Sequence, residues 1–237
     1  MLDARLAFGT RVLFDDVSLS LPASSWSCLL GKSGCGKSSL LRMMAGLDVS
    51  SDARLTLMDT SHRPFDKRIA WMGQQDLLLP WRRVIDNVQL GAVMRGERHD
   101  TDRAMALLER VGLGQAARRY PQTLSGGERA RVALARTLFE QAPLVLMDEP
   151  FAALDAMTRL DIHAQACELL SDRIVLMVTH DPLEALRLSD QLLVMRDSPA
   201  RIERVLPPEG APPRDPAGAS ISHHHGQLLK ALTEQDA

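Results

Sequence analysis

The sequence has few aromatic residues, few cysteines and no long hydrophobic run, and each shortage excludes something. Aromatic residues make up 4% of the 237 residues although hydrophobic residues make up 45%, so we expect a sizeable core built mainly from Leu, Val, Ala and Met. The cysteines, Cys28, Cys35 and Cys167, show no pairing pattern and no metal-ligand spacing with histidines. They are typical of free thiols in a reducing cytosol. No apolar run approaches the ~18 residues of a membrane-spanning helix.

The sequence also lacks a strong charge of either sign. Its 28 basic and 30 acidic residues leave a net charge of −2. This balance argues against bulk electrostatic binding to DNA or RNA, so we expect no nucleic-acid partner. Residues 1–8 contain an acid and an arginine, and no signal peptide is visible there. Because no apolar run is long enough to span a membrane, another polypeptide must supply the channel if the chain serves in transport.

Short apolar runs alternate with helical patterns, which predicts an α/β protein with a mainly parallel sheet. Within residues 2–30 the pattern predicts short strands separated by turns, one of them at Asp15-Asp16, and then a buried strand over 26–30. Helical spacing follows over 37–47. The remaining expected strands are 54–58, 69–72, 144–147, 174–179 and 192–195, with helices near 156–170 and 182–188.

Residues 82–142 change character and predict an inserted helical subdomain. Asp100 and Ser125 are each placed to cap a helix that carries apolar residues at helical spacing. We expect one domain over residues 1–205, followed by a proline-rich tail over 206–237. The tail is expected to be extended or disordered, apart from a possible short helix over 227–233. The three histidines at 223–225 are assigned no metal site.

Residues 31–38 read Gly-Lys-Ser-Gly-Cys-Gly-Lys-Ser, which is the P-loop pattern with a strand before it and a helix after it. The glycines allow backbone N–H groups to converge on phosphate oxygens, Lys37 can reach the β- and γ-phosphates, and Ser38 can ligate Mg²⁺. The alternative interpretation is an ordinary Gly/Ser turn, which would not require a strand before it and a helix after it. Cys35 either contributes only its backbone N–H or carries a thiol whose modification blocks nucleotide entry. The expected ATP-binding residues of this loop are Gly31, Lys32, Ser33, Gly34, Cys35, Gly36, Lys37, Ser38 and Ser39.

Polar residues follow two of the expected buried strands. Asp148 and Glu149 end the run that begins at Leu144, and His180 ends the run over 174–179. The carboxyl ends of parallel strands form the ligand-binding edge of an open α/β sheet. Asp148 suits the Mg²⁺ shell through water, and Glu149 suits activation of an attacking water. His180 is expected to hold that water and the γ-phosphate in position.

A third motif, Leu124-Ser125-Gly126-Gly127-Glu128, resembles the signature of ATP-binding subunits of ABC transporters, which usually ends in Gln. The resemblance covers roughly residues 3–205. It implies a RecA-like P-loop NTPase core with a mainly parallel sheet, an N-terminal antiparallel β subdomain and the inserted ABC helical subdomain. It also implies a head-to-tail dimer, in which Ser125, Gly126 and Gly127 of one copy cover the ATP bound by the P-loop of the other.

The same resemblance assigns further roles. Phe8 resembles the aromatic residue that stacks on adenine, although it also suits simple core packing. Gln74 resembles the glutamine that contacts Mg²⁺ and water and links to the membrane partner, with Gln75 as an alternative one residue away. Asp155 resembles the aspartate at the dimer interface. Glu149 and His180 match the catalytic glutamate and the switch histidine.

A finer resemblance lies in residues 78–81, Leu-Leu-Pro-Trp, and in residues 84–88. They are similar to subunits of importers for nitrate, aliphatic sulfonates, taurine and thiamine-precursor pyrimidines. This implies an ATPase at the cytoplasmic face of the membrane, bound to permease subunits and served indirectly by a solute-binding protein. A soluble ABC ATPase acting on nucleic acid or ribosomes, a non-catalytic binding module and a P-loop kinase are the rival interpretations.

Overall fold

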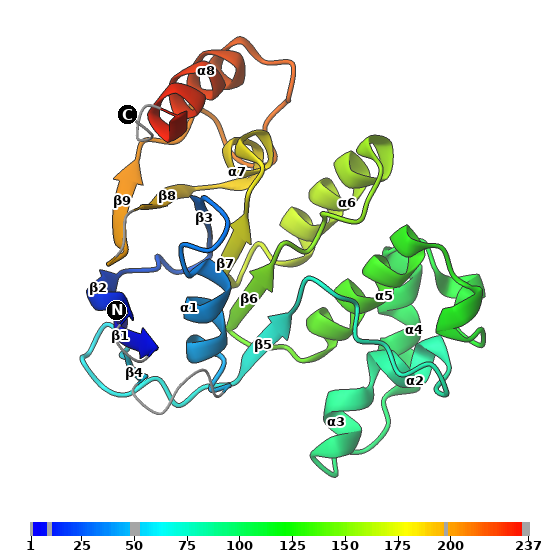
Figure 1. Ribbon diagram of the computed structural model, residues 1–237. Helices are drawn as coiled ribbons and strands as arrows, with labels where there is room; N and C mark the ends of the chain where they lie inside the picture. The colour runs from blue at the N-terminus through cyan, green and yellow to red at the C-terminus, as the bar shows by residue number, and fades with distance from the viewer. Residues whose placement is uncertain (1, 9–10, 48–52, 197–198, 234–237) are drawn as a thin grey trace.

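The computed structural model describes residues 2–8, 11–47, 53–196 and 199–233. Its larger sheet has six strands in the order β5-β6-β7-β3-β8-β9 (Figure 1). Every neighbouring pair is parallel except β8 with β9. This agrees with the predicted mainly parallel sheet. The strands are β3 (Ser25–Gly31), β5 (Ile69–Met72), β6 (Leu144–Asp148), β7 (Ile174–Thr179), β8 (Gln191–Arg196) and β9 (Arg201–Val205).

The central strands β3, β6, β7 and β8 of the large sheet are buried on both faces. Successive side chains of a strand point to opposite faces, so each strand contributes to two clusters. Val175 and Met177 of β7 pack into one hydrophobic cluster with residues of the helices α5, α6, α7 and α8. Leu176 and Val178 pack into a second cluster with α1 and the antiparallel strands. Parallel strands that are covered on both faces read as continuous apolar runs, which is why the sequence indicated them so clearly.

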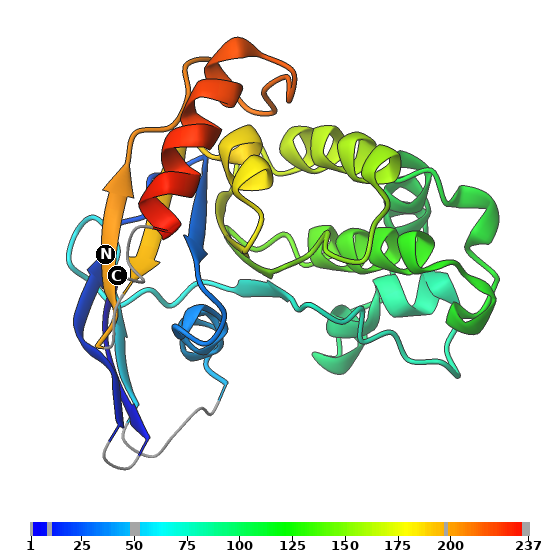
Figure 2. The same cartoon turned by 45° about the horizontal axis from the view of Figure 1, so that its top comes forward.

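The smaller sheet is antiparallel, with the order β2-β1-β4. Its strands are β1 (Leu2–Phe8), β2 (Arg11–Leu19) and β4 (Arg54–Leu57). Figure 2 shows them on the side of the molecule away from helices α2 to α5. The predicted turn at Asp15-Asp16 is wrong. The strand continues through it as a bulge opposite Arg5, where Asp16 takes a φ of 62°.

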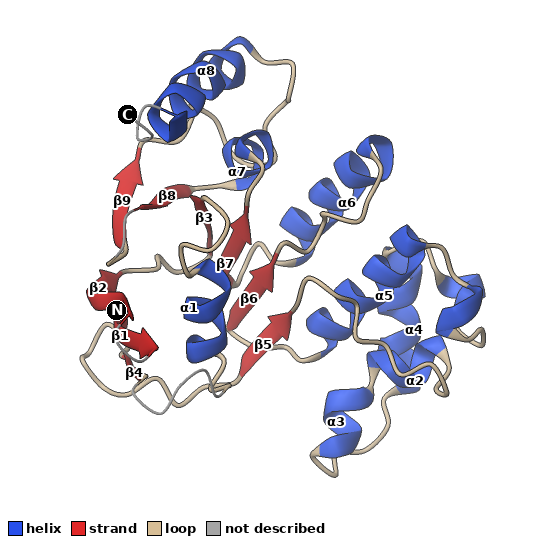
Figure 3. Ribbon diagram, viewed as in Figure 1, coloured by secondary structure: helices blue, strands red, loops and turns tan. Residues whose placement is uncertain are grey.

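Four α-helices lie between β5 and β6, and residues 73–143, all described, contain no strand. They gather on one side of the molecule (Figure 3). They are α2 (Val84–Val88), α3 (Leu90–Met94), α4 (Thr101–Arg110) and α5 (Gly126–Phe139). The expected caps are present, since the Asp100 carboxylate accepts from Arg103 N and Ser125 caps α5. The other helices are α1 (Lys37–Met44), α6 (Ala156–Leu169), α7 (Pro182–Leu188) and α8 (Ala219–Thr233).

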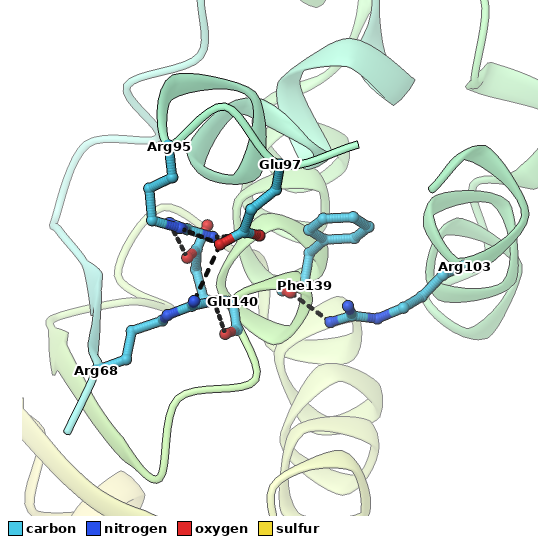
Figure 4. Close-up of polar contacts among 6 residues, drawn as sticks. All are labelled: Arg68, Arg95, Glu97, Arg103, Phe139 and Glu140. Carbon is cyan, nitrogen blue, oxygen red and sulfur yellow. Dashed lines mark hydrogen bonds and ion pairs between the residues drawn. The ribbon is translucent and has the colours of Figure 1, made fainter. Parts of the chain in front are cut away.

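An ionic network ties these helices to the start of β5 (Figure 4). Arg68 lies immediately before β5 and donates to Glu97 Oε1 and to the carbonyl of Glu140, both at 3.1 Å. Arg95 donates to Glu97 Oε1 at 2.8 Å and to Glu140 Oε2 at 2.7 Å. Arg68 and Arg95 therefore connect the residues that follow α3 and α5 to the segment immediately before β5.

The segment after residue 205 packs against the rest of the protein. The helix expected over 227–233 is confirmed, but it begins eight residues earlier. Residues 219–226 form the first part of α8 (Ala219–Thr233), so the predicted extended tail is wrong there. Ile221 and Leu228 of α8 are buried in the main core cluster. Arg214 donates to the carbonyls of Leu186 and Ser189 at 2.8 and 2.9 Å and so fastens the segment to the end of α7. The division into domains near residue 205 stays a prediction.

Two further observations concern the described residues. None of their helices is both long enough and apolar enough to cross a bilayer. The histidines at 223–225 lie on α8 rather than in a loop, where His224 Nδ1 contacts the carbonyl of Ser220 at 2.8 Å.

Candidate functional site

The carboxyl ends of the adjacent strands β6, β7 and β3 border a cavity of about 470 Å³. Gly31 ends β3 and opens the glycine loop, Glu149 follows β6, and His180 follows β7. Residues from three predicted motifs therefore meet at one edge of the sheet, as parallel pairing requires. The cavity is lined by Leu13, Ser33, Gly34, Gly36, Lys37, Ser38, Ser39, Gln74, Glu149 and His180.

Lys37 lies at the start of α1 and folds back beneath the glycine loop. Its ammonium group donates to the carbonyls of Gly31 and Lys32 at 2.7 and 2.8 Å, and its side chain is only 6% exposed. Carbonyl oxygens fix the position of the ammonium group without supplying a full opposite charge. The first turn of α1 adds its unpaired N–H groups on the same side. This corner of the cavity is built to receive an anion.

The second corner combines a hydroxyl group and a carboxylate. Ser38 Oγ donates to Asp148 Oδ1 at 3.0 Å, and Asp148 is 7% exposed. Burial raises the pKa of the Asp148 carboxyl above its ordinary value and the charge of Glu149 adds to the rise, while the hydrogen bond from Ser38 opposes it.

These hard oxygen donors fit Mg²⁺. The described residues contain no cluster of three His, Cys, Asp or Glu side chains that could hold a metal ion by themselves. The donor set thus suits an ion that takes its remaining ligands from phosphate and water, which is how Mg²⁺ binds at nucleotide sites.

Glu149 occupies the third corner. Its backbone takes a φ of 47°, and its N–H donates to the carbonyl of Val178 at 2.9 Å. This turn directs Glu149 away from its neighbour Asp148. Its Oε2 atom lies 3.0 Å from His180 Nδ1 and accepts from Gln74 Nε2 at 3.4 Å. One carboxylate oxygen is thus held between the two other predicted catalytic side chains.

The geometry also bears on the open assignments. Gln74 lines the cavity with Glu149 and also borders a second cavity, whereas Gln75 lines only the second of these two, which favours Gln74. Cys35 is half-buried, and its Sγ accepts from the Lys37 ammonium at 3.9 Å. This contact is compatible with both roles considered for Cys35, a backbone N–H donor to phosphate and a thiol whose modification blocks nucleotide entry. Phe8 ends β1, and its side chain lies outside the described part of the structure.

The signature residues lie elsewhere. Among the described residues that line the P-loop cavity, none belongs to 125–127. Gly126 instead borders a second cavity of about 400 Å³ with Gln75 and Ala153. A Cβ atom added to Gly127 would lie 3.5 Å from a methyl group of Leu154. Within one chain, therefore, the signature adjoins the 150–155 loop and not the P-loop. Asp155 caps α6 and accepts from Thr158 N at 3.0 Å.

Glu128 has a structural role that the sequence analysis missed. The Ser125 hydroxyl accepts from Glu128 N at 3.1 Å, while Glu128 Oε2 accepts from Ser125 N at 2.7 Å. This reciprocal pair is a capping box, and the Ser-x-x-Glu spacing was the signal that could have revealed it. The hydrogen bond from the Ser125 backbone lowers the pKa of Glu128. An acid in place of the usual Gln is thereby accommodated at the start of α5.

A P-loop lysine, a buried Ser–Asp pair and a positioned carboxylate at one sheet edge define an α/β nucleotide-binding protein that handles phosphate. Comparison with known proteins identifies the family. The ABC transporter family model matches residues 14–152. The chain belongs to the ABC transporter family, as an ATP-binding subunit that couples ATP hydrolysis to transport.

Curated relatives match along nearly the whole chain. An uncharacterized ABC transporter ATP-binding protein of Haemophilus influenzae is 42% identical over 237 residues, covering 97% of this chain and 96% of that protein. The aliphatic sulfonates import ATP-binding protein SsuB 1 of Paracoccus denitrificans is 42% identical over 230 residues, covering 95% and 90%. Its counterpart SsuB of Burkholderia ambifaria is 41% identical over 227 residues, covering 95% and 69%.

Solved structures are also similar. The dimeric post-hydrolysis structure of the ATP-binding cassette MJ0796 bound to ADP and Pi has a TM-score of 0.70 at 26% identity, covering 86% of this chain and 97% of that one. A second dimeric structure of MJ0796, a bacterial ABC transporter cassette, has a TM-score of 0.71. The predicted fold class, family and ATP binding are confirmed.

Proposed function

We propose that two copies of this chain bind Mg-ATP between them and drive import of aliphatic sulfonates through a separate membrane permease. The observation that carries the catalytic part is the position of Glu149, whose carboxylate lies between His180 and Gln74 in the cavity that the P-loop lines. The names of the SsuB relatives support the solute class.

ATP binding starts at the P-loop. The backbone N–H groups of residues 31–39 and the N-terminal end of α1 bind the phosphates, and Lys37 moves its hydrogen bonds from loop carbonyls to the β- and γ-phosphates. The adenine ring stacks on Phe8. Because the Lys37 ammonium group is already confined beneath the loop, little side-chain entropy is lost when the phosphate arrives.

Ser38, Asp148 and Gln74 are the residues that would hold Mg²⁺, with Asp148 acting through water. When bound, the ion neutralises charge on the β- and γ-phosphates. The pKa of Asp148 is raised because burial makes its ionised form unfavourable in the apo site. A cation bound beside this carboxylate would offset that unfavourable free energy.

Glu149 Oε2 accepts a proton from the attacking water, and His180 keeps the carboxylate, the water and the γ-phosphate in line. The 3.0 Å contact between His180 Nδ1 and Glu149 Oε2 supports this division of roles. The Gln74 side chain contacts the same oxygen and comes from the segment that leads into α2. Positioning of this kind supplies most of the catalysis in phosphoryl transfer.

The second copy supplies the signature. Residues 125–127 lie away from the P-loop cavity of their own chain but present the N-terminus of α5, which suits an anion. A head-to-tail dimer places them over the ATP of the partner, with Asp155 at the interface, and the dimeric MJ0796 cassettes offer a precedent.

The permease is expected to dock beside residues 77–88. Leu77 and Trp81 are 59% and 70% exposed there, so two large apolar side chains four residues apart face solvent. This face follows directly from Gln74, so docking and the catalytic site share one segment. A peripheral position at the cytoplasmic face of the membrane follows from this partner, and a solute-binding protein delivers the solute from the other side.

Reconstitution tests the proposal. The chain is co-purified with its permease, placed in liposomes with the solute-binding protein, and assayed for phosphate release with ethanesulfonate, taurine, nitrate or no solute. We expect ethanesulfonate to stimulate hydrolysis and a Glu149→Gln complex to release no phosphate. Stimulation by nitrate alone would overturn the sulfonate assignment. Co-purification with nucleic acid or ribosomes instead of a membrane protein would favour the soluble rival.

A further inference from the structure

Helices α6 and α7 are joined by two polar contacts one helical turn apart. Arg159 Nη1 lies 3.6 Å from Asp181 Oδ2. His163 Nε2 lies 3.1 Å from Glu184 Oε1. His163 and Glu184 are 2% and 6% exposed, so the second contact is made inside the protein. Neither side chain belongs to the cavity described above.

Both contacts lead to the residues that follow His180, and His163 also contacts the loop that carries Glu149. Asp181 caps α7 and directly follows His180, and Glu184 lies in the first turn of α7. On the other side, the ring of His163 meets the ring of Phe151 edge-on, with centroids 4.8 Å apart and an interplanar angle of 65°. Phe151 is buried two residues after Glu149.

His163 therefore touches the loop that carries Glu149 and also the helix that follows His180. The catalytic contact between these loops is 3.0 Å from His180 Nδ1 to Glu149 Oε2. A shift of α7 along α6 would move His180 without moving Glu149. The His163–Glu184 contact opposes such a shift because hydrogen bonds are directional, whereas apolar packing alone is not.

The pair is poorly explained as a source of stability. Burying a polar or charged pair costs desolvation, and apolar residues of similar volume often stabilise as well or better. His163 Nδ1 is also buried without a hydrogen-bond partner among the described residues, which adds to the cost. A role in holding the two loops in register accounts for a pair that stability alone does not favour.

We propose that His163 and Glu184 are positioning residues for ATP hydrolysis, which keep Glu149 and His180 in register through Phe151 and α7. This inference rests on the proposed catalytic roles of Glu149 and His180. It adds a link between their loops that runs through α6, outside the cavity.

The test compares turnover with stability in four variants: His163→Leu, His163→Gln, the double variant H163L/E184L, and Phe151→Leu. Each is assayed for kcat, the KM for ATP, and Tm. We expect His163→Leu to lower kcat by about ten- to a hundredfold with KM unchanged, because a small misplacement of catalytic groups costs that much. Its Tm also falls, since Glu184 is left buried without its partner.

The double variant H163L/E184L separates a positioning role of the His163–Glu184 pair from a purely stabilising one. Without a buried unpaired carboxylate it recovers Tm, but without a directional contact it keeps the low kcat. His163→Gln recovers kcat, since its Nε2–H can donate to Glu184. A double variant that regains kcat together with Tm would overturn the proposal, as would a His163→Gln protein with wild-type Tm and the low kcat.

Phe151→Leu decides the matter if the variants at His163 fail to fold. It removes the ring contact and leaves the pair intact, so a lowered kcat supports the proposal and a wild-type kcat refutes it. Glu168→Gln is the matched control, because its carboxylate pairs with Arg110 at 2.9 Å at the other end of α6, and its kcat should not change. Hydrolysis retained by Glu149→Gln would instead remove the proposed catalytic role itself, which is a different result.

Discussion

Two glycines of the P-loop differ in what an added methyl group would meet. Gly34 and Gly36 both have a positive φ, 82° and 107°. A Cβ on Gly34 would find no atom within 4 Å, whereas one on Gly36 would lie 2.6 Å from Leu13 Cδ2 and 2.8 Å from the ring of Phe14. Phe14 is fully buried and cannot move aside freely. Alanine at position 34 therefore tests backbone strain alone, whereas alanine at position 36 tests backbone strain together with overpacking.

The expected magnitudes follow from these contacts. Gly34→Ala should cost about 1–2 kcal/mol, the strain of a left-handed backbone at a residue with a Cβ. Gly36→Ala carries the same strain and adds about 1–3 kcal/mol of overpacking, for a total of about 2–5 kcal/mol. At about 2–4 °C per kcal/mol for a chain of this size, Tm should fall by about 2–8 °C and about 4–20 °C respectively.

Calorimetry of the two nucleotide-free variants beside the wild type is the assay. We expect both Tm values to fall, with the larger loss in Gly36→Ala. Equal losses would show that Phe14 and Leu13 do not confine the loop, and the argument from packing would then be wrong. A stabilised Gly34→Ala would refute the left-handed backbone at that position.

Two substitutions probe the charges of the same site. Lys37→Ala should weaken ATP binding by about ten- to a hundredfold, the worth of a charge-assisted hydrogen bond, and a wild-type Kd by titration calorimetry would contradict the assigned phosphate contact. Because burial raises the pKa of Asp148 in the folded protein, the fold binds that proton more tightly than the unfolded chain does, and the ionised carboxylate destabilises the apo protein as pH rises above 3.8. The Asp148→Asn variant should therefore have a higher apo Tm than the wild type at neutral pH, and this difference should disappear in acid. The variant should still lose Mg-dependent hydrolysis. If its apo Tm instead fell below that of the wild type, and fell most at neutral pH, the charge of Asp148 would be shown to stabilise the fold.

Much of the fold could be predicted because the central strands of the large sheet are buried on both faces. The bounds of β5, β7 and α7 agree with the predicted ranges to the residue. The strand β9 was missed because Arg201–Val205 lies at the sheet edge, pairs only with β8 and carries polar residues that resemble a loop. Helix α8 was placed too late because Ser and His residues precede its apolar ones, so packing of Ile221 on the core decides where it begins.

The site was predictable where the chemistry lies in short motifs. The P-loop, Asp148, Glu149 and His180 each lie at or just after the carboxyl end of a strand, so pairing of those strands brings them together without further information. The His163–Glu184 contact joins residues 21 positions apart on two helices, and its partner Phe151 looks like ordinary core packing. Nothing in the spacing of these residues indicated it, since it depends on how α6 and α7 lie against each other.

The central claim is that the ATP on each P-loop is bound between two copies of the chain, and the mass of the Glu149→Gln protein tests it most directly. With ATP and Mg²⁺, light scattering should give about twice the monomer mass of 26.1 kDa, because nucleotide binds but is not hydrolysed. Without ATP the variant should remain a monomer, and adding Ser125→Arg to it should prevent dimerisation while ATP still binds. A monomeric Glu149→Gln protein with ATP bound would contradict the account.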